Sequence, residues 1–513
     1  MSPARSSRIT VLRDVEIPLR DGTRSVAEVW VPDDATPKPT ILMRTPYLKE
    51  VRAPIAIFDP RTAAARGYAS VIQDCRGRGG SKGSFDPYRN EELDGFDTIQ
   101  WVASQDWSDG RVVMGGTSYE GASQWLAAVA APPALCGISP ALSSDDFGEG
   151  WSYRNGVAEF GFLTSWSGAE LAPLPKRMLD DPSLAWRDPQ AAIDVAPWLR
   201  EWLANEAGSE FWSSRSVASR RSEVNVPALV IGGWFDIFLD GTLGSYSRST
   251  HPLDRLVIGP WGHDDGTLSH LIGEASVGIA GFGLRTVFRW ILDYYDAILS
   301  GQLPKLPKVR AYALGGRRWV DLESWPPTDA ATERLQISTG SFVVDPGNPV
   351  TVVGGRGLLM HVPGRGFGIA DQRRLLDCDD VHLALRTTLA ADTLLGGPIR
   401  ADLRVAMQSS GDQWRLWVAL LCVVQPNGAL YNLVEGVARG GPDDERVRLE
   451  LGHTFTWLPA GSELVLFVMG SWFPRWPMPT SGGTQRILDG SYLDLTVVPP
   501  ALLGDGRRQS GFP

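Results

Sequence analysis

Short apolar runs that end in glycine, proline or aspartate recur through the first 300 residues of the chain. They occupy residues 25–32, 39–47, 111–116, 227–236 and 254–263. Residues 92–105 instead carry apolar side chains at a helical spacing, at Phe96, Ile99 and Val102. Buried strands that alternate with helical stretches predict an α/β domain with a largely parallel sheet, covered by helices on both faces.

Two later stretches depart from this rhythm. Residues 145–224 are rich in tryptophan and mixed charge, and residues 189–207 have a helical pattern. After residue 304, β-like runs separated by turn residues replace the helices. We therefore predict an α/β domain made of residues 1–144 and 225–303, a helical cap over 145–224, and an all-β sandwich over 304–513.

Composition narrows the class of protein. The chain has 513 residues, more than one hydrophobic core supports, and its hydrophobic (43%) and charged (21%) fractions are those of a globular protein. A net charge of −10 argues against a nucleic acid or an anionic membrane as partner, because either requires a basic face.

No signal peptide is visible, and no apolar run is long enough to span a bilayer. The four cysteines form no CxxC pair, so we expect neither disulfides nor a zinc site, and a reducing cytoplasm as the location.

The run Val112-Val113-Met114 ends in Gly115-Gly116, and Ser118 follows directly before a helical stretch. A sharp strand–serine–helix turn presents the hydroxyl at the carboxyl edge of a parallel sheet and aims the first helical N–H groups at the atom it attacks. Because glycine and serine are also common in ordinary turns, the turn alone leaves a plain loop as an alternative.

A serine nucleophile needs a base, and the base needs a carboxylate that orients it. Two later runs of similar form end in Asp236 and His263, in the order serine, acid, histidine. Asp240 is an alternative acid, whereas Asp264 and Asp265 are too close to His263 in sequence to orient it. Among the other histidines, His251 precedes its strand, His270 follows His263 in a loop, and three lie in the β-rich half: His361, His382 and His453.

Seven segments, five of them in the first 263 residues, resemble a known family: RTPYLK, QDCRGRGGSKGSF, GGTSYEGASQW, GGWFDIF, GPWGH, RWVDLESWPP and GSWFPRWPMPT. They resemble the cocaine esterase-like (CocE/NonD) hydrolases, relatives of the X-Pro dipeptidyl-peptidases and the α-amino acid ester hydrolases. The resemblance implies an α/β-hydrolase fold with a helical cap and a C-terminal jelly-roll sandwich. It also implies a Ser118–Asp236–His263 triad and an oxyanion hole formed by the Tyr47 hydroxyl and the Tyr119 backbone N–H.

Several aromatic side chains are candidates for a substrate pocket, because tryptophans beside glycine, proline or in a cap often line one. Core packing is the alternative for each of Trp151, Trp166, Trp234 and Trp261. Glu120 departs from the cocaine-esterase pattern and resembles the α-amino acid ester hydrolases. We expect it to be a solvated residue at the start of a helix, favoured by the helix dipole.

These features predict a serine hydrolase that cleaves an ester or amide of a small molecule through an acyl-enzyme, with no metal and no cofactor. An acyltransferase or cyclase with the same triad stays open, as do an α-amino acid ester hydrolase or dipeptidyl-peptidase activity and a binding protein that has lost catalysis. A homodimer also stays open as an assembly.

Overall fold

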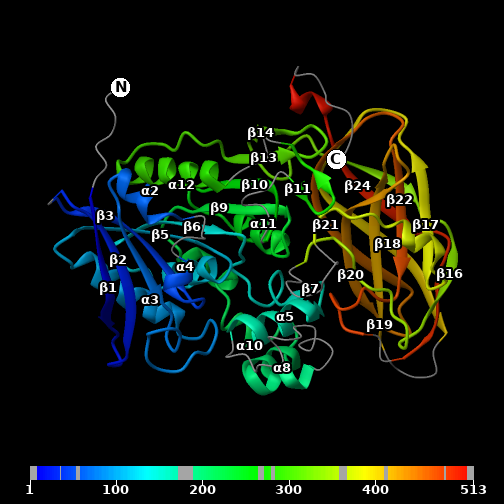
Figure 1. Cartoon of the computed structure of the whole chain (residues 1–513). Coiled ribbons are helices and arrows are strands. Elements are labelled where there is room, and N and C mark those ends of the chain that lie inside the picture. Colours follow the sequence, from blue (N-terminus) through cyan, green and yellow to red (C-terminus); the bar gives the residue numbers. More distant parts are fainter. Residues whose placement is uncertain are drawn as a thin grey trace.

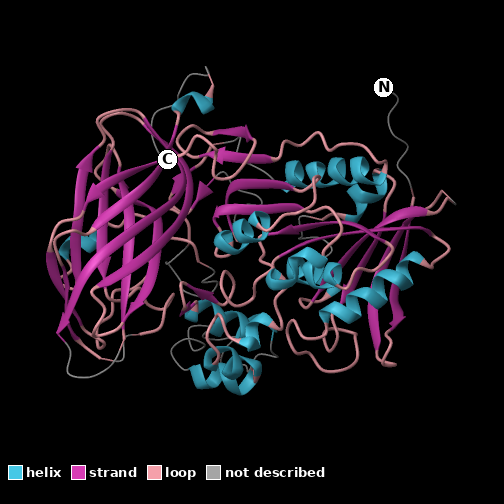
Figure 2. Cartoon of the chain, turned by 180° about the vertical axis from the view of Figure 1, so that it is seen from behind, coloured by secondary structure: helices cyan, strands magenta, loops and turns pink. Residues whose placement is uncertain are grey.

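The protein is divided into an α/β part, a small helical part and a β-sandwich (Figures 1 and 2). The computed structural model describes residues 8–34, 36–52, 58–171, 189–263, 271–278, 284–357, 367–408, 414–478 and 481–504. In both views the α/β part and the sandwich lie at opposite ends, and the small helical part lies between them along one side.

The α/β part is built on a ten-stranded sheet with the order β1-β2-β4-β3-β5-β6-β9-β10-β13-β14. Neighbouring strands from β4 to β13 are parallel, and β1, β2 and β14 are antiparallel additions at the two edges. The strands are β1 (Ile9–Pro18), β2 (Arg24–Pro32), β3 (Lys38–Thr45), β4 (Ala69–Asp74), β5 (Ser108–Thr117), β6 (Leu135–Ala141), β9 (Leu229–Phe235), β10 (Arg255–Gly262), β13 (Val309–Ala313) and β14 (Arg318–Leu322). The predicted α/β class is confirmed.

Each face of the sheet has its own core, because successive side chains of a strand point to opposite faces. Leu42 and Met114 pack with helices α3 (Glu91–Ala103), α4 (Tyr119–Val129) and α11 (Leu239–Ser247). Ile41 and Val113, their neighbours along the strands, pack instead with α2 (Pro60–Ala65) and α12 (Leu284–Leu299). Figure 1 shows α2 and α12 above the sheet and α3 and α4 below it. A fully buried sheet of this kind explains the continuous apolar runs of the sequence.

The helical part covers the side of the sheet that carries α4. It contains the hairpin β7 (Tyr153–Arg154) and β8 (Val157–Ala158) and the helices α5 (Phe160–Trp166), η1 (Ser167–Leu171), α8 (Pro189–Val195), α9 (Trp198–Ala204), α10 (Glu210–Ser213) and η2 (Ala218–Glu223). The helical pattern of residues 189–207 is divided into α8 and α9 at Pro197. Proline has no N–H for the helical hydrogen bond and its ring clashes with the preceding turn, so one continuous helix is excluded.

The sandwich consists of a six-stranded and a four-stranded antiparallel sheet. The first contains β15 (Ala331–Gln336), β24 (Tyr492–Val498), β18 (Thr393–Gln408), β23 (Gly483–Ile487), β16 (Gly340–Val344) and β21 (Arg446–Leu458), and the second β17 (Val381–Thr388), β22 (Glu463–Met469), β19 (Arg415–Val424) and β20 (Leu430–Gly440). The remaining short elements are α1 (Lys49–Arg52), β11 (Leu271–Ile272), β12 (Ala275–Ser276), η4 (Arg373–Asp377) and η5 (Pro500–Leu503).

Strands β13 and β14 follow residue 304, where the sequence predicts the sandwich to begin. The structure places both in the ten-stranded sheet, with β13 parallel to β10. An apolar alternating pattern indicates that a segment forms a β-strand, but it does not indicate which sheet that strand joins. No helix of the described residues combines the length and the apolar character needed to cross a bilayer.

A network of ion pairs joins the three parts, and its members are buried except for Asp240, whose side chain is 32% exposed. Asp240 of α11 lies 2.9 Å from Arg154 of the cap hairpin and 3.1 Å from Arg356 of the sandwich segment. Glu159, directly before α5, is paired with Arg475 at 3.2 Å, and Arg475 is also paired with Glu435 of β20, which accepts the Arg356 backbone N–H at 2.8 Å. Three arginines balance three carboxylates, as buried charge requires.

His453 of β21 lies beside this network, and its Nδ1 accepts a hydrogen bond of 3.1 Å from the Trp325 indole. Burial lowers the pKa of His453 from 6.5 to about 4, with Arg356 and Arg400 adding to the effect of burial and Asp240 opposing it. Below pH 6.5 the unfolded chain therefore binds a proton that the folded chain does not bind until about pH 4.

We predict that the free energy of unfolding falls as the pH is lowered from 6.5 to 4, and that His453→Gln reduces this slope. Glutamine offers an oxygen to Trp325 but does not titrate. Urea unfolding of both proteins at several pH values measures the difference. Parallel pH profiles in the two proteins would contradict the assignment.

Candidate active site

Ser118 occupies a strained turn between β5 and α4. Its backbone has φ 60° and ψ −125°, a left-handed conformation that a residue with a side chain adopts only at a cost of about 1–3 kcal/mol. Strand β5 ends at Thr117 and α4 begins at Tyr119, so the turn consists of this one residue. The structure thus places the serine at the carboxyl end of a central strand, where ligands of parallel sheets bind.

Two close contacts explain the glycines on either side of the serine. A Cβ at Gly116, whose φ is +136°, would lie 2.5 Å from Cβ of Glu120. A Cβ at Gly121 would lie 2.5 Å from Cβ and 2.7 Å from Oγ of Ser143. Gly121 therefore lets the first turn of α4 approach the chain that leaves β6. This contact gives a physical reason for a glycine three residues after the serine, one later than in the common G-x-S-x-G motif.

Glu120 is fully buried, so the prediction of a solvated side chain is wrong. Its Oε2 accepts a hydrogen bond of 3.0 Å from the backbone N–H of Thr117. This carboxylate folds back over the start of the helix and binds the last residue of the strand. It holds the two sides of the Ser118 turn together.

His263 lies between Ser118 and Asp236. Its Nε2 is 3.0 Å from Oγ of Ser118, and its Nδ1 is 2.8 Å from Oδ2 of Asp236. An ionised carboxylate only accepts hydrogen bonds, so Nδ1 donates to Asp236 and Nε2 accepts the Ser118 hydroxyl proton in neutral histidine. The three side chains come from the ends of β5, β9 and β10 and meet at one edge of the sheet.

The turn after β9 fixes the carboxylate. Asp236 is fully buried, and its Oδ1 accepts the backbone N–H of Phe238 at 2.5 Å. The Phe238 ring packs edge-to-face on His263, with 5.1 Å between ring centroids. Phe238 was not identified from the sequence, although its position two residues after Asp236 in the WFDIF segment places it beside His263.

Asp240, the alternative acid, has a different role. It is held by Arg154 and Arg356, as described above. Burial alone would raise the pKa of Asp240, but these two guanidinium groups hold it well below its ordinary value. The structure thus places Asp240 in the ion-pair network between the domains.

The structure describes three other histidines that could have been the base, and they are in other parts of the fold. His251 is in the loop before β10, where its Nδ1 accepts the Leu253 backbone N–H at 3.2 Å. His382 is in β17, and His453 is at the interface between domains. Four residues considered from the sequence lie outside the described residues: Asp264, Asp265, His270 and His361.

Tyr47 and Tyr119 lie at the ends of neighbouring elements. Tyr47 follows β3, and its phenolic oxygen accepts a hydrogen bond of 3.0 Å from the Trp166 indole of the cap. Arg78 donates to the carbonyl of Pro46 at 2.7 Å and so holds the segment that carries Tyr47. Tyr119 is the first residue of α4, so its backbone N–H has no acceptor within the helix.

Aromatic side chains of the cap cover this edge of the sheet. Trp151 stacks on Phe238, with 3.9 Å between ring centroids, and packs against Phe162 and Trp166. Trp166 in turn contacts the ring of Tyr119 and binds Tyr47. The structure therefore brings Trp151 and Trp166 to the neighbourhood of the candidate triad.

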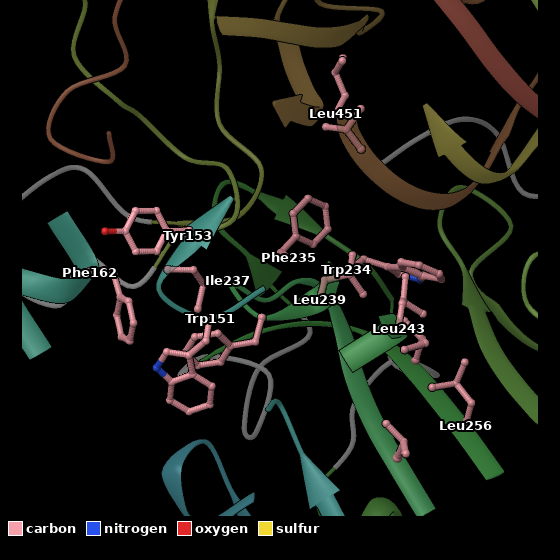
Figure 3. Close-up of a cluster of buried hydrophobic side chains, with 14 of the residues drawn as sticks. Trp151, Tyr153, Phe162, Trp234, Phe235, Ile237, Leu239, Leu243, Leu256 and Leu451 are labelled. Carbon is pink, nitrogen blue, oxygen red and sulfur yellow. The ribbon is translucent and has the colours of Figure 1, made fainter. Parts of the chain in front are cut away.

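The other two tryptophans predicted to line a pocket pack elsewhere. Trp234 donates from its indole to the carbonyl of Tyr312 at 2.7 Å and packs on Trp325. In Figure 3 Trp151 and Phe162 lie at one end of the buried cluster and Trp234 at the other. Trp261 belongs to the core on the opposite face, with α12. Both tryptophans follow a similar Val-Ile-Gly segment, but their places in the sheet direct the two side chains away from the cap.

A serine in a left-handed turn after a parallel strand, with a histidine and an aspartate at the ends of two later strands, defines a serine hydrolase of the α/β-hydrolase class. The family model of the X-Pro dipeptidyl-peptidase (S15 family) matches residues 21–265, and that of the X-Pro dipeptidyl-peptidase C-terminal non-catalytic domain matches residues 302–498. The chain is 30% identical to the cocaine esterase of Rhodococcus sp. (strain MB1 Bresler) in an alignment of 489 positions that covers 84% of this chain and 83% of that protein. The chain belongs to the cocaine esterase-like (CocE/NonD) family of serine hydrolases.

Solved structures show the same fold over nearly the whole chain. An aminopeptidase from the marine sediment archaeon Thaumarchaeota archaeon and an α-amino acid ester hydrolase each have a TM-score of 0.80 and 21% identity, and cover 97% of this chain and 98% of theirs. A CocE/NonD family hydrolase from Staphylococcus aureus has a TM-score of 0.72 and 16% identity, with 96% and 94% covered. The predicted fold of catalytic domain, cap and sandwich is confirmed.

We predict that Gly121→Ala lowers the free energy of unfolding by about 1–3 kcal/mol, because the added methyl overlaps Ser143. Adding Ser143→Gly should restore part of this loss. Gly208→Ala is the matched control, since a Cβ there meets no atom within 4 Å. Chemical unfolding measures all four proteins. An unchanged stability in Gly121→Ala would show that α4 and the segment after β6 can separate.

Proposed function

We propose that Ser118 is the nucleophile, His263 the general base and Asp236 the carboxylate that orients it. The supporting observation is the chain of two hydrogen bonds, 3.0 Å from Ser118 to His263 and 2.8 Å from His263 to Asp236. Nε2 accepts the hydroxyl proton as Oγ attacks the carbonyl carbon, and the imidazolium returns that proton to the leaving alcohol or amine. Water, activated by the same nitrogen, then hydrolyses the acyl-enzyme and restores Ser118.

The oxyanion of the tetrahedral intermediate is received by the Tyr47 hydroxyl and the Tyr119 backbone N–H. Both belong to segments adjoining the serine, at the end of β3 and at the start of α4. A phenol that accepts the Trp166 N–H keeps its own O–H as a donor. The start of α4 also contributes the positive end of the helix dipole.

The substrate class is an ester or amide of a small molecule with an apolar group beside the scissile carbonyl. Trp151 and Phe238 form a stacked pair against His263, and Trp166 lies beside Tyr47. These rings are almost fully buried, with 1% of Trp151, 0% of Phe238 and 2% of Trp166 exposed. They keep water from the side of His263 and Tyr47, which favours an apolar substituent there through desolvation. The name of the Rhodococcus relative, a cocaine esterase, agrees with an ester substrate.

The cellular location belongs to the same proposal. The four cysteines are free thiols: Cys75, Cys136, Cys378 and Cys422. Unpaired cysteines suit a reducing compartment, which supports residence in the cytoplasm. Fractionation of the producing cells tests this, and recovery of the enzyme outside the cytoplasmic fraction would contradict it.

We expect Ser118→Ala to lose turnover by about 10⁴-fold or more while the fold persists, because no other group can form the acyl-enzyme. Hydrolysis of a nitrophenyl ester and labelling by a fluorophosphonate probe provide the two measurements. His263→Ala should lose turnover similarly, whereas His251→Ala, the matched control, should keep it. Labelling of Ser118→Ala at the wild-type level would move the nucleophile elsewhere.

Tyr47→Phe removes one oxygen and keeps the ring. The loss of one oxyanion donor costs about 10²–10³-fold in kcat, and KM should change little because the charge develops only in the transition state. Tyr246→Phe, which removes a hydroxyl at the far end of α11, is the control. Steady-state kinetics within a few-fold of wild type would show that the Tyr47 hydroxyl does not bind the oxyanion.

A further inference from the structure

The side chain of Tyr119 is fully buried. Its hydroxyl donates to Oε1 of Glu91 at 3.1 Å and accepts the backbone N–H of Tyr88 at 2.9 Å. Its ring stacks on that of Tyr88, with 5.2 Å between centroids. Burial and the Glu91 carboxylate raise the pKa of the Tyr119 phenol well above its ordinary value, so it remains a neutral donor.

Glu91 is in turn held by Arg44. Nη2 of Arg44 lies 2.9 Å from Oε2 of Glu91, and Nη1 donates to the Glu91 carbonyl at 2.9 Å. The two side chains are 0% and 3% exposed, so the charges are out of contact with water. Nε of Arg44 donates to Gln73 of β4 at 2.8 Å, which completes the attachment of the guanidinium to the sheet.

This ion pair connects the two segments that carry the proposed oxyanion donors. Arg44 is in β3, three residues before Tyr47, and its backbone carbonyl accepts the hydroxyl of Ser123 in α4 at 3.3 Å. Glu91 begins α3 and reaches the side chain of Tyr119. One buried pair thus fixes the end of β3 and the first residue of α4 relative to each other.

The energetics favour a role in positioning. A buried ion pair is at best a weak source of stability, because desolvation of both charges offsets their attraction, and apolar side chains of similar size would serve packing as well. The hydrogen bonds from Nη1 of Arg44 to the Glu91 carbonyl and from the Tyr119 hydroxyl to Oε1 of Glu91 are directional and specify geometry instead. The peptide between Ser118 and Tyr119 adjoins a residue with φ 60°, and rotation that relieves this strain would turn the Tyr119 N–H. An anchored Tyr119 side chain opposes that rotation.

We propose that Arg44 and Glu91 are positioning residues for the oxyanion hole, acting through the phenolic hydroxyl of Tyr119. This inference rests on the proposed function, which assigns the Tyr119 N–H to the oxyanion. Tyr119 contributes only its backbone N–H to the proposed chemistry. Its side chain nevertheless affects catalysis, because it holds that N–H in place. A donor displaced by even a fraction of an ångström loses much of its value, since active-site geometry must be held within about 0.5 Å.

The test is Tyr119→Phe, which keeps the ring and the backbone N–H and removes only the anchoring oxygen. We expect kcat to fall by about tenfold or more, with KM within twofold and the pH profile of kcat unchanged. Affinity for an arylboronic acid, which forms a tetrahedral anion on the serine, should fall by the same factor. Tyr294→Phe is the control, because its buried hydroxyl donates to the Leu253 carbonyl at 3.2 Å on the α12 side.

A second variant covers the case in which Tyr119→Phe does not fold. Glu91→Gln keeps an oxygen that can accept the Tyr119 hydroxyl but removes the charge that binds Arg44. It should lose kcat and boronate affinity together, with KM retained. Unchanged kcat and boronate affinity in a folded variant would overturn the proposal, as would an equal loss in Tyr294→Phe, which assigns the effect to stability.

Comparison with Tyr47→Phe separates this proposal from the proposed function. If Tyr47→Phe loses 10²-fold or more in kcat and Tyr119→Phe loses nothing, the oxyanion hole stands and the positioning role is wrong. If both variants turn over like wild type while Ser118→Ala is inactive, the Tyr47 donor and the positioning role are both assigned wrongly, whereas the nucleophile assignment stands. A loss of kcat in both variants, smaller for Tyr119→Phe, supports both.

Discussion

The left-handed backbone at Ser118 is the constraint on which the rest of the site depends. A one-residue turn from strand to helix requires φ near 60°, and this conformation persists only where the surroundings hold it. Gly116 and Gly121 permit the two close approaches that the turn needs, and the buried carboxylate of Glu120 binds the backbone of Thr117 across it. The sheet, with six neighbouring strand pairs running parallel, then brings two further strand ends to the same edge. Strain at one residue is thus balanced by packing and hydrogen bonds distributed over several elements.

Buried charge joins the domains that surround this edge. The sandwich contributes Arg356 and Arg475, which reach Asp240 of α11 and Glu159 of the cap. Because Asp240 lies four residues after Asp236, the same contacts hold α11, the helix that follows the turn of the candidate acid. An unpaired charge in this interface would cost several kcal/mol, so the three parts favour one relative placement. Apolar burial therefore assembles each part, and the ion pairs determine how the three parts are placed relative to one another.

The sequence predicts the candidate catalytic residues better than it predicts the packing of the side chains around them. Ser118, Asp236 and His263 end apolar runs, and parallel strands bring such ends together, so their proximity follows from local pattern and chain order. The burial of Glu120 does not follow, because a glutamate in a first helical turn is usually solvated, and its enclosure depends on tertiary contacts such as the close approach of Gly116. Trp234 and Trp261 occupy equivalent positions in similar segments but pack on different partners. Which core receives a side chain depends on strand register and sheet twist, which single-sequence patterns do not contain.

The aromatic cap has an electrostatic consequence as well as a steric one. Trp151, Trp166 and Phe238 replace water beside His263 and Tyr47, and a hydrogen bond in such low-dielectric surroundings stabilises developing charge more than the same bond in water. The Trp166 indole donates to the oxygen of Tyr47, which polarises the phenol and makes its O–H a stronger donor, since hydrogen bonds in a chain reinforce one another. A tryptophan that is 119 residues from Tyr47 in sequence is thereby coupled to the donor proposed for the oxyanion. With Tyr47 as the proposed oxyanion donor, the cap would contribute to the chemistry itself, and a substrate group that displaces Trp166 would alter turnover as well as binding.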